Sequence, residues 1–231
     1  MIQFTRTILD NGLTVICNND KSTPFVSVNI LYKVGSRNEQ PEKTGFAHLF
    51  EHLMFGGSQN IPDYDRHVQA AGGDSNAYTT NDLTNYYITI PAANIETALW
   101  LESDRMAALN FSQHVLDVQR QVVIEEFKQR YLNNPYGDLW LKLRPLAYKV
   151  HPYRWATIGI SPEHIERARL EDVEAFFHRY YAPDNAIIAI SGNIEENRAL
   201  ELVTKWFGDI PPSHATPLVI PQEPIQTEER R

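Results

Sequence analysis

The stretch GFAHLFEHLMFGG, residues 45–57, restricts the possible folds more than any other part of the chain. Apolar side chains cover a helix of this sequence nearly all round, so the helix must be largely buried. Three of its residues, His48, Glu51 and His52, are nevertheless polar. A buried glutamate beside two histidines is costly without a cation that compensates the charge. The fold therefore has to bury this helix and also satisfy these three side chains.

The spacing of the polar residues suits a metal ion. His48 and His52 are four residues apart, so both imidazoles lie on one face of the helix and can aim at one shared point. Glu51 borders that point, where a general base could take a proton from a metal-activated water. The order H-x-x-E-H is a zinc peptidase signature. The alternative is a chance pattern in a core helix, and a third ligand decides between the two.

Candidates for a third ligand lie in QRQVVIEEFKQR, residues 119–130. Because Cys17 is the only cysteine, a metal must use histidine and carboxylate ligands. Glu126 lies four residues after Val122 and three after Val123, on the helical stripe that continues from Val115, Val118 and Gln119, whereas Glu125 turns toward solvent. Glu126 is therefore the better candidate. Without the two histidines, the default would be an exposed glutamate in a charge run with Lys128 and Arg130.

Strand and helix signals are interspersed irregularly along the chain. Asp10-Asn11-Gly12 separates two alternating segments and predicts a hairpin, because Asn and Gly tolerate positive φ. A third strand is predicted at 24–36, where apolar residues alternate until Gly35. The sequence further predicts helices at 61–73, 92–109, 114–133, 138–148, 170–185 and 195–210, strands within 75–91 and at 186–194, and a loop at 151–164.

This mixture indicates an α+β fold, a mostly antiparallel sheet packed with helices. We expect a single domain at residues 1–210. Residues 211–231 contain five prolines and lack helical or strand periodicity. They predict a linker or tail toward a missing second half.

Composition excludes several classes of protein. The chain is 42% hydrophobic and 22% charged, as is usual for a globular protein, and no apolar run approaches the ~20 residues of a membrane span. The net charge of −8 argues against a nucleic-acid surface. The start lacks the basic and apolar regions of a secretory signal. We expect a soluble protein, cytoplasmic or periplasmic.

Five segments in order resemble the N-terminal domain of the pitrilysin/insulinase family of zinc peptidases, which includes mitochondrial processing peptidase. They are HLFEH at 48–52, GGDSNAYTTNDLTNY at 72–86, RQVVIEEF at 120–127, HPY at 151–153 and YYAPDNAIIAISGNI at 180–194. The resemblance implies a metallohydrolase domain like that of LuxS and mitochondrial processing peptidase. It also implies Zn²⁺ bound by His48, His52 and Glu126, with Glu51 as the general base of an endopeptidase.

The resemblance implies roles for further residues. Asn76 and Ala77 would lie on an exposed edge strand to which an extended peptide adds as another strand, and Tyr78 could line the same groove. Gln119 stands where the family usually has a second glutamate. It could hydrogen-bond a zinc-bound histidine or Glu126, but it adds no charge beside the metal.

The resemblance also implies a second homologous half, as a domain or a subunit, that supplies an arginine and a tyrosine to the substrate. No matching pair can be assigned here, since Tyr153 and Arg154 belong to a first-half segment. Two other functions remain open: a noncatalytic peptide-binding or partner subunit of the same fold, and a small-molecule hydrolase or lyase on a related zinc fold. Metal analysis combined with a peptidase assay discriminates among the three.

Overall fold

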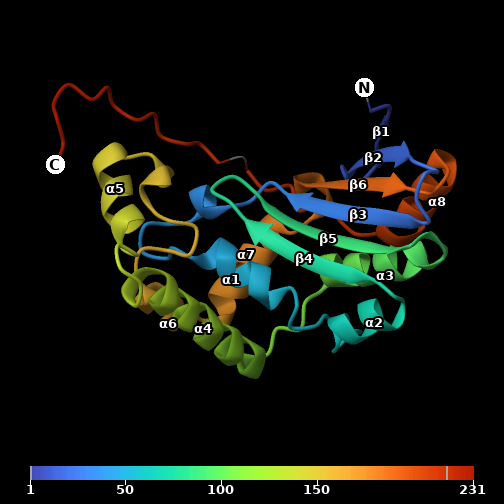
Figure 1. Cartoon of the computed structure of the whole chain (residues 1–231), viewed down its shortest axis with the longest axis horizontal. Helices are drawn as coiled ribbons and strands as arrows, with labels where there is room; N and C mark the ends of the chain where they lie inside the picture. The colour runs from blue at the N-terminus through green and yellow to red at the C-terminus, as the bar shows by residue number, and fades with distance from the viewer. Residues whose placement is uncertain (1, 217) are drawn as a thin grey trace.

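The computed structural model describes residues 2–216 and 218–231 and is built around one six-stranded sheet (Figure 1). The strand order is β1-β2-β6-β3-β5-β4. All neighbouring strands are antiparallel except β2 and β6, which are parallel. The predicted α+β class with a mostly antiparallel sheet is therefore confirmed. The strands are β1 Thr5–Ile8, β2 Thr14–Asn19, β3 Phe25–Tyr32, β4 Asp74–Thr79, β5 Thr84–Pro91 and β6 Ala186–Gly192.

The described chain also contains eight α-helices. They are α1 Phe46–Leu53, α2 Tyr64–Ala70, α3 Ile95–Ala107, α4 Gln113–Phe127, α5 Leu139–Ala147, α6 Pro162–Glu166, α7 Leu170–Tyr180 and α8 Glu196–Phe207. A π-helical turn, Lys128–Leu132, extends α4, and short 3-10 turns occupy Ser36–Asn38, Ala92–Asn94, Pro152–Arg154 and Pro183–Asn185. In the described residues no helix is long and apolar enough to cross a membrane.

One face of the sheet is buried and the other is more open. Along β3 the side chains of Val26, Val28, Ile30 and Tyr32 are buried, while the residues between them are only partly covered. Alternation of this kind follows from the two-residue repeat of a strand. Helices α3 and α8 pack against the sheet, and α1 lies beside β4 and β5. The core thus sits between the buried face of the sheet and the helices.

The predicted hairpin is confirmed, because β1 and β2 pair on either side of Gly12. The expected loop at 151–164 is wrong at both ends, since Pro152–Arg154 is a 3-10 turn and α6 starts at Pro162. The start of α6 has a local cause. The Ser161 side chain accepts the N–H of Glu163, and proline suits the first position of a helix.

The tail has no helix or strand in its described residues, but it lies against the domain. The Glu223 carboxylate accepts the backbone N–H groups of Lys149, Val150 and His151 at 2.6, 2.9 and 2.9 Å. Arg230 donates to the carbonyl of Leu146 at 2.8 Å, near the end of α5. These contacts join the tail to the segment around α5.

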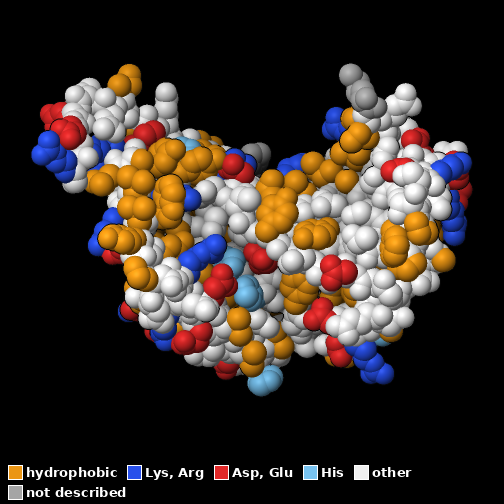
Figure 2. Space-filling view, viewed as in Figure 1, with side chains coloured by type: hydrophobic (Ala, Val, Ile, Leu, Met, Phe, Trp, Pro, Cys, Tyr) orange, Lys and Arg blue, Asp and Glu red, His pale blue; other side chains and the backbone are white. Residues whose placement is uncertain are grey.

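The outer face of α5 is apolar and exposed. Trp140 is 56% exposed, Leu139 53% and Leu143 41%, and Tyr136 lies just before the helix. Figure 2 shows hydrophobic atoms gathered over this part of the surface. A contiguous exposed apolar patch usually marks a contact surface.

Candidate metal centre

The helix that carries both histidines, α1, has a glycine at its N-cap position, and a side chain from an earlier segment of the chain caps it. Gly45 has a φ of 91°, and a Cβ there would lie 2.6 Å from the carbonyl oxygen of Ile158. Gly45 has no side chain to cap the helix, and the buried Glu39 carboxylate instead accepts the N–H groups of Gly45 and Ala47 at 2.9 and 2.8 Å. Carboxylates are favourable at a helix N-terminus. Glu39 therefore fixes the start of α1.

The other end of α1 is held by buried groups from the sheet and α3. The Tyr86 hydroxyl donates to the carbonyl of Phe50 at 3.3 Å, and Arg105 donates to that of Met54 at 3.4 Å. Arg105 is itself paired with Glu102, and both side chains are 1% exposed. Helix α1 is thus fixed at both ends, which limits how far His48 and His52 can move.

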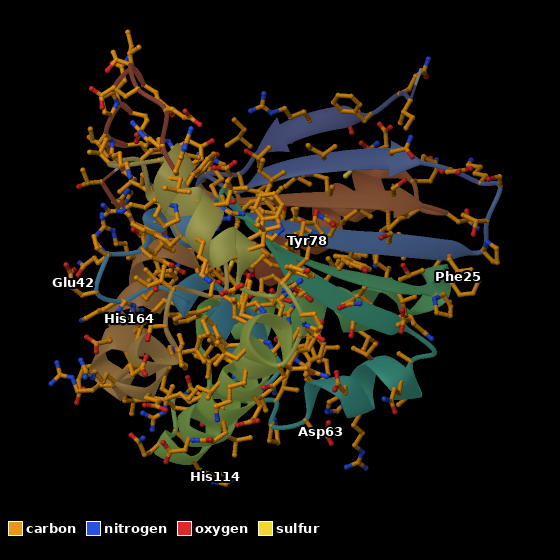
Figure 3. All side chains as sticks on the ribbon, turned by 60° about the vertical axis from the view of Figure 1, so that its left-hand side comes forward. Phe25, Glu42, Asp63, Tyr78, His114 and His164 are labelled. Carbon is orange, nitrogen blue, oxygen red and sulfur yellow. The ribbon has the colours of Figure 1, made fainter. Side chains whose placement is uncertain are left out.

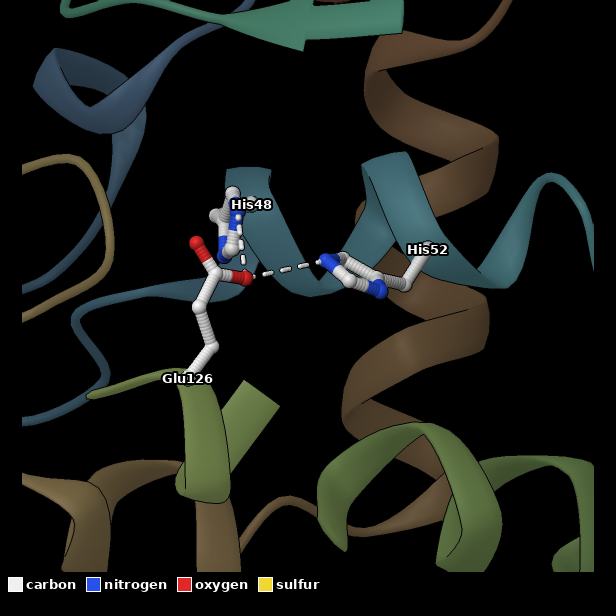
Figure 4. A group of neighbouring side chains, drawn as sticks. All are labelled: His48, His52 and Glu126. Carbon is white, nitrogen blue, oxygen red and sulfur yellow. Dashed lines mark ion pairs between the residues drawn. The ribbon is translucent and has the colours of Figure 1, made fainter. Parts of the chain in front are cut away.

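His48, His52 and Glu126 come together although α1 and α4 are far apart in the sequence (Figure 4). The Nε2 atoms of both histidines lie 3.5 Å from Oε2 of Glu126. One ligand atom from each residue lies within 4.8 Å of the others. His48 is buried, whereas His52 and Glu126 are partly exposed. Solvent can therefore reach the cluster from one side.

Glu126 is less exposed than Glu125, as the helical phase predicted, but other residues on the predicted stripe are more exposed than expected. The Glu125 side chain is 67% exposed and pairs with Lys128, while that of Glu126 is 36% exposed. Val118 and Val122 on the Glu126 stripe are nevertheless 45% and 44% exposed. The interior contacts of α4 are made by Val123, which belongs to the predicted stripe, and by Leu116, Ile124 and Phe127. Glu126 borders an open face of α4, at the edge of its buried stripe.

The charges at the cluster favour cation binding. Burial lowers the pKa of His48 to about 4, against the opposing effect of Glu126, so this imidazole is neutral at pH 7. Contact with His52 lowers the pKa of Glu126, which is therefore ionised. Neutral imidazole and ionised carboxylate are the forms that bind metals. Oε1 of Glu126 lies 3.7 Å from exposed Arg130, a pair that contributes little.

The donor set and its spacing fit zinc. Two histidines and one carboxylate are a known catalytic zinc set, with ligand bonds of about 2.0–2.2 Å in tetrahedral geometry. Such bonds place neighbouring ligand atoms roughly 3.4 Å apart, and both His-to-Glu126 separations are 3.5 Å. Three protein ligands leave a fourth position open. The buried Nδ1 of His48 has no hydrogen-bond partner in the described chain, so the ring is oriented by its packing and by the contact of Nε2 with Glu126.

Glu51 lies next to His52 on α1 and contacts β4. Its Oε2 accepts a hydrogen bond from the Thr79 hydroxyl at 2.7 Å. Burial raises the pKa of Glu51, and the Thr79 hydrogen bond acts in the opposite direction. A carboxyl with a raised pKa near a metal cluster suits proton transfer close to neutral pH. The contact with Thr79 was absent from the sequence predictions.

The three residues predicted to bind substrate all lie on β4, the edge strand nearest α1. Asn76 and Tyr78 point to the exposed side, and Ala77 to the half-buried side. The Ala77 N–H bonds the Asn76 side-chain oxygen at 2.8 Å. Figure 3 shows Tyr78 near the end of β4 that meets the helices, with Phe25 at the opposite end of the sheet. The strand predicted to bind peptide therefore lies beside α1, the helix that carries both histidines.

Gln119 lies on α4, two turns before Glu126, and is partly exposed. Its side chain makes no hydrogen bond to any residue that the structure describes, His48 and Glu126 included. Two other side chains at the site escaped the sequence predictions, Thr79 and Glu39. Thr79 lies inside the segment GGDSNAYTTNDLTNY at 72–86, whereas Glu39 lies outside the quoted motifs. Only the tertiary arrangement shows that both contact α1.

Two family models match the chain. Residues 14–139, more than half of it, match the insulinase model of peptidase family M16. Residues 167–231 match the model of the peptidase M16 inactive domain.

Individual proteins agree with the family match. The zinc protease PqqE of Helicobacter pylori is 39% identical over 202 residues, covering 86% of this chain and 45% of that protein. The mitochondrial-processing peptidase subunit beta of Saccharomyces cerevisiae is 28% identical over 229 residues, covering 97% and 49%. The crystal structure of a protease from Helicobacter pylori superposes with a TM-score of 0.88 at 36% identity, covering 96% and 54%. The chain thus spans about half the length of the curated relatives it matches.

Proposed function

The chain belongs to the insulinase family of peptidases, peptidase family M16, and we propose that it is the catalytic half of a zinc-dependent endopeptidase. Its ligands would be His48, His52 and Glu126, and its general base would be Glu51. The observation that carries this proposal is the pair of 3.5 Å contacts between the two imidazoles and one Glu126 oxygen, with Glu51 on the same helix.

The proposed chemistry is hydrolysis of a peptide bond. Zinc in such a site supplies Lewis acidity, which makes water nucleophilic near neutral pH and polarises a carbonyl. Glu51 accepts the proton of the attacking water and delivers it to the departing amine. His48 stays neutral because it is buried, and it therefore remains available as a ligand.

The proposed substrate is an extended or unfolded peptide. β4 is an edge strand, and adding a peptide strand to it requires a free backbone on the substrate. The Ala77 N–H now donates to the side-chain oxygen of Asn76. When a peptide strand pairs with β4, this N–H would donate to a carbonyl of the peptide instead. Tyr78, 48% exposed, would contact a side chain of the bound peptide.

A second homologous half is part of the proposal. The relatives are about twice as long as this chain, and the exposed apolar face of α5 provides a surface for such a contact. Residues 211–231 would lead toward that half. Its contribution would be substrate binding near the scissile bond, without which positioning of the peptide is incomplete.

The experiment combines metal analysis with peptide cleavage. His48→Ala and Glu126→Ala should abolish stoichiometric zinc, while the neighbouring Glu125→Ala, which changes an exposed glutamate, should keep it. Glu51→Gln should retain zinc and lose hydrolysis. Full zinc occupancy in His48→Ala or Glu126→Ala refutes the ligand set, and near-normal turnover in Glu51→Gln removes that residue from its role.

The same measurements separate the competing functions. A protein without zinc that still binds extended peptides would be a noncatalytic partner subunit. A protein that holds zinc but cleaves no peptide, even with a second half supplied, would favour a small-molecule hydrolase or lyase. The joint presence of His48, Glu51, His52 and Glu126 favours the peptidase.

A further inference from the structure

Thr79 connects the proposed general base to the proposed peptide edge. It is the last residue of β4, and its hydroxyl donates to Oε2 of Glu51 at 2.7 Å. Within the described ranges 2–216 and 218–231, no other side chain donates a hydrogen bond to Glu51. Thr79 therefore occupies a unique place between α1 and β4.

The register of β4 places the backbone of Thr79 at the free edge. The N–H of Thr80 bonds the carbonyl of Leu83 at 2.8 Å, which closes the hairpin between β4 and β5. Antiparallel pairs alternate between bonded and non-bonded, so Thr79 opposite Thr84 is a non-bonded pair, as is Ala77 opposite Tyr86. The backbone groups of Ala77 and Thr79 accordingly point away from β5, where an added strand would lie.

Side-chain direction completes the geometry. Ser75, Ala77 and Thr79 share the half-buried side of β4, whereas Asn76 and Tyr78 are exposed on the other. Thr79 thus gives both its hydroxyl and its backbone N–H to the Glu51 carboxylate, while Ala77, two residues earlier on the same strand, presents its backbone to an incoming peptide. A displacement of about 1 Å at a reacting group can cost roughly 100-fold in rate.

We propose that Thr79 is a positioning residue that holds the Glu51 carboxylate in register with a peptide strand bound along β4. This inference rests on the proposed function, since it assigns no chemistry to Thr79 itself. Its hydroxyl bonds Oε2 of Glu51, and Oε1 has no side-chain hydrogen-bond donor among the residues that the structure describes. The alternative is a structural tie that only fastens α1 to β4.

The experiment compares three variants of the zinc-loaded protein, assayed with its second half. Thr79→Val removes the hydroxyl and keeps the shape, Thr79→Ser keeps the hydroxyl, and Thr84→Val is the matched control. Thr84 lies directly opposite Thr79, and its buried hydroxyl donates to the carbonyl of Val34 at 2.8 Å without touching Glu51. Both valine variants therefore lose one hydrogen bond in the same hairpin.

Thr79→Val should lower kcat about 10- to 100-fold, the usual effect of losing a partner that orients an active-site group. KM and zinc stoichiometry should stay unchanged, and Thr79→Ser should restore kcat. Thr84→Val should lower thermal stability and leave kcat unchanged. Crystal structures add a readout independent of turnover, because the Glu51 carboxylate should keep its orientation in Thr79→Ser and lose it in Thr79→Val.

Two results overturn the inference while the proposed function stands. One is normal kcat in Thr79→Val when Glu51→Gln is inactive, and the other is an equal loss of kcat in Thr79→Val and Thr84→Val. An unmoved Glu51 carboxylate in the Thr79→Val crystal structure overturns it as well. Near-normal turnover in Glu51→Gln overturns both proposals together.

Discussion

The buried ion pair between Glu102 and Arg105 supports the C-terminal end of α1. Its contribution to stability can be tested by replacing Arg105. Nε of Arg105 donates to Oε2 of Glu102 at 3.0 Å, and Nη2 donates to Oε1 at 2.5 Å. The guanidinium also lies 4.5 Å from the ring centres of Tyr64 and Tyr86. Burial alone lowers the pKa of Arg105, but the adjacent Glu102 more than reverses this, so the pair is charged.

Arg105→Ala leaves the Glu102 carboxylate in the core with one remaining side-chain partner, the Tyr64 hydroxyl at 2.7 Å. Removing one member of a buried pair costs about 3–5 kcal/mol, because the other charge is left uncompensated. For a chain of this size 1 kcal/mol corresponds to roughly 2–4 °C in Tm. The variant should therefore melt about 6–20 °C below the wild type.

A second variant shows whether the uncompensated charge is the cause. Combining Arg105→Met, Glu102→Leu and Tyr64→Phe removes both charges and the hydroxyl that would lose its acceptor. Apolar replacements of a whole buried pair are often neutral or stabilising, so this triple variant should recover most of the loss.

Urea unfolding followed by circular dichroism measures all of these free energies. Lys128→Ala, which breaks an exposed ion pair with Glu125, serves as the control and should change stability by less than about 1 kcal/mol. A loss below about 1 kcal/mol in Arg105→Ala contradicts the reasoning, since it lies far under the range for a broken buried pair. So does a triple variant as unstable as the single one. Where Arg105→Ala does not fold, the triple variant decides.

Three further predictions concern other parts of the chain. Glu39→Gln puts an amide donor against a backbone N–H at the start of α1 and should lower the free energy of unfolding by about 1–3 kcal/mol. Because burial raises the pKa of Glu39, the stability of the wild type should fall as pH rises through the interval between the usual and the raised pKa. Urea midpoints measured across that interval should fall with pH in the wild type but not in the variant. Desolvation alone raises the pKa of Glu223, but the N–H groups of His151, Val150 and Lys149 bring it to about 2, so the contact of the tail with residues 149–151 should persist as pH falls until that value is approached. Glu223→Ala should speed limited proteolysis of the tail at pH 7, whereas the control Glu228→Ala should not. The 231 residues expressed alone should bind zinc yet cleave unstructured peptides poorly, and robust turnover by a verified monomer would contradict the role given to a second half.

The sequence could predict that His48, His52 and Glu126 belong together because it offered two local clues. Four-residue spacing places the histidines on one face of any helix, and helical phase separates Glu126 from Glu125. Helical phase, however, shows only which residues of α4 share a face, and not which face is buried. It could not show that the stripe with Val118 and Val122 is the exposed one, because burial of a face depends on which elements pack against it.

Apart from the meeting of the two histidines with Glu126, contacts between distant segments were beyond sequence reasoning. The hydrogen bond from Thr79 to Glu51 and the capping of α1 by Glu39 both depend on how α1 settles against the sheet and its loops. The parallel pairing of β2 with β6 joins strands separated by most of the chain. No local propensity encodes such a pairing, since the strand pattern is compatible with several sheet orders.

The distribution of the proposed groups over two helices has a mechanical consequence. Two ligands and the base lie on α1, a single short helix that is buried and held at both ends by Glu39, Tyr86 and Arg105. Glu126 lies in the last turn of α4, is partly exposed, and is followed directly by a π-helical turn. Movement is therefore easier at the end of α4 than in α1. Any adjustment on metal binding should come from Glu126, whereas the backbone positions of Glu51, His48 and His52 stay fixed relative to one another because they share one helix.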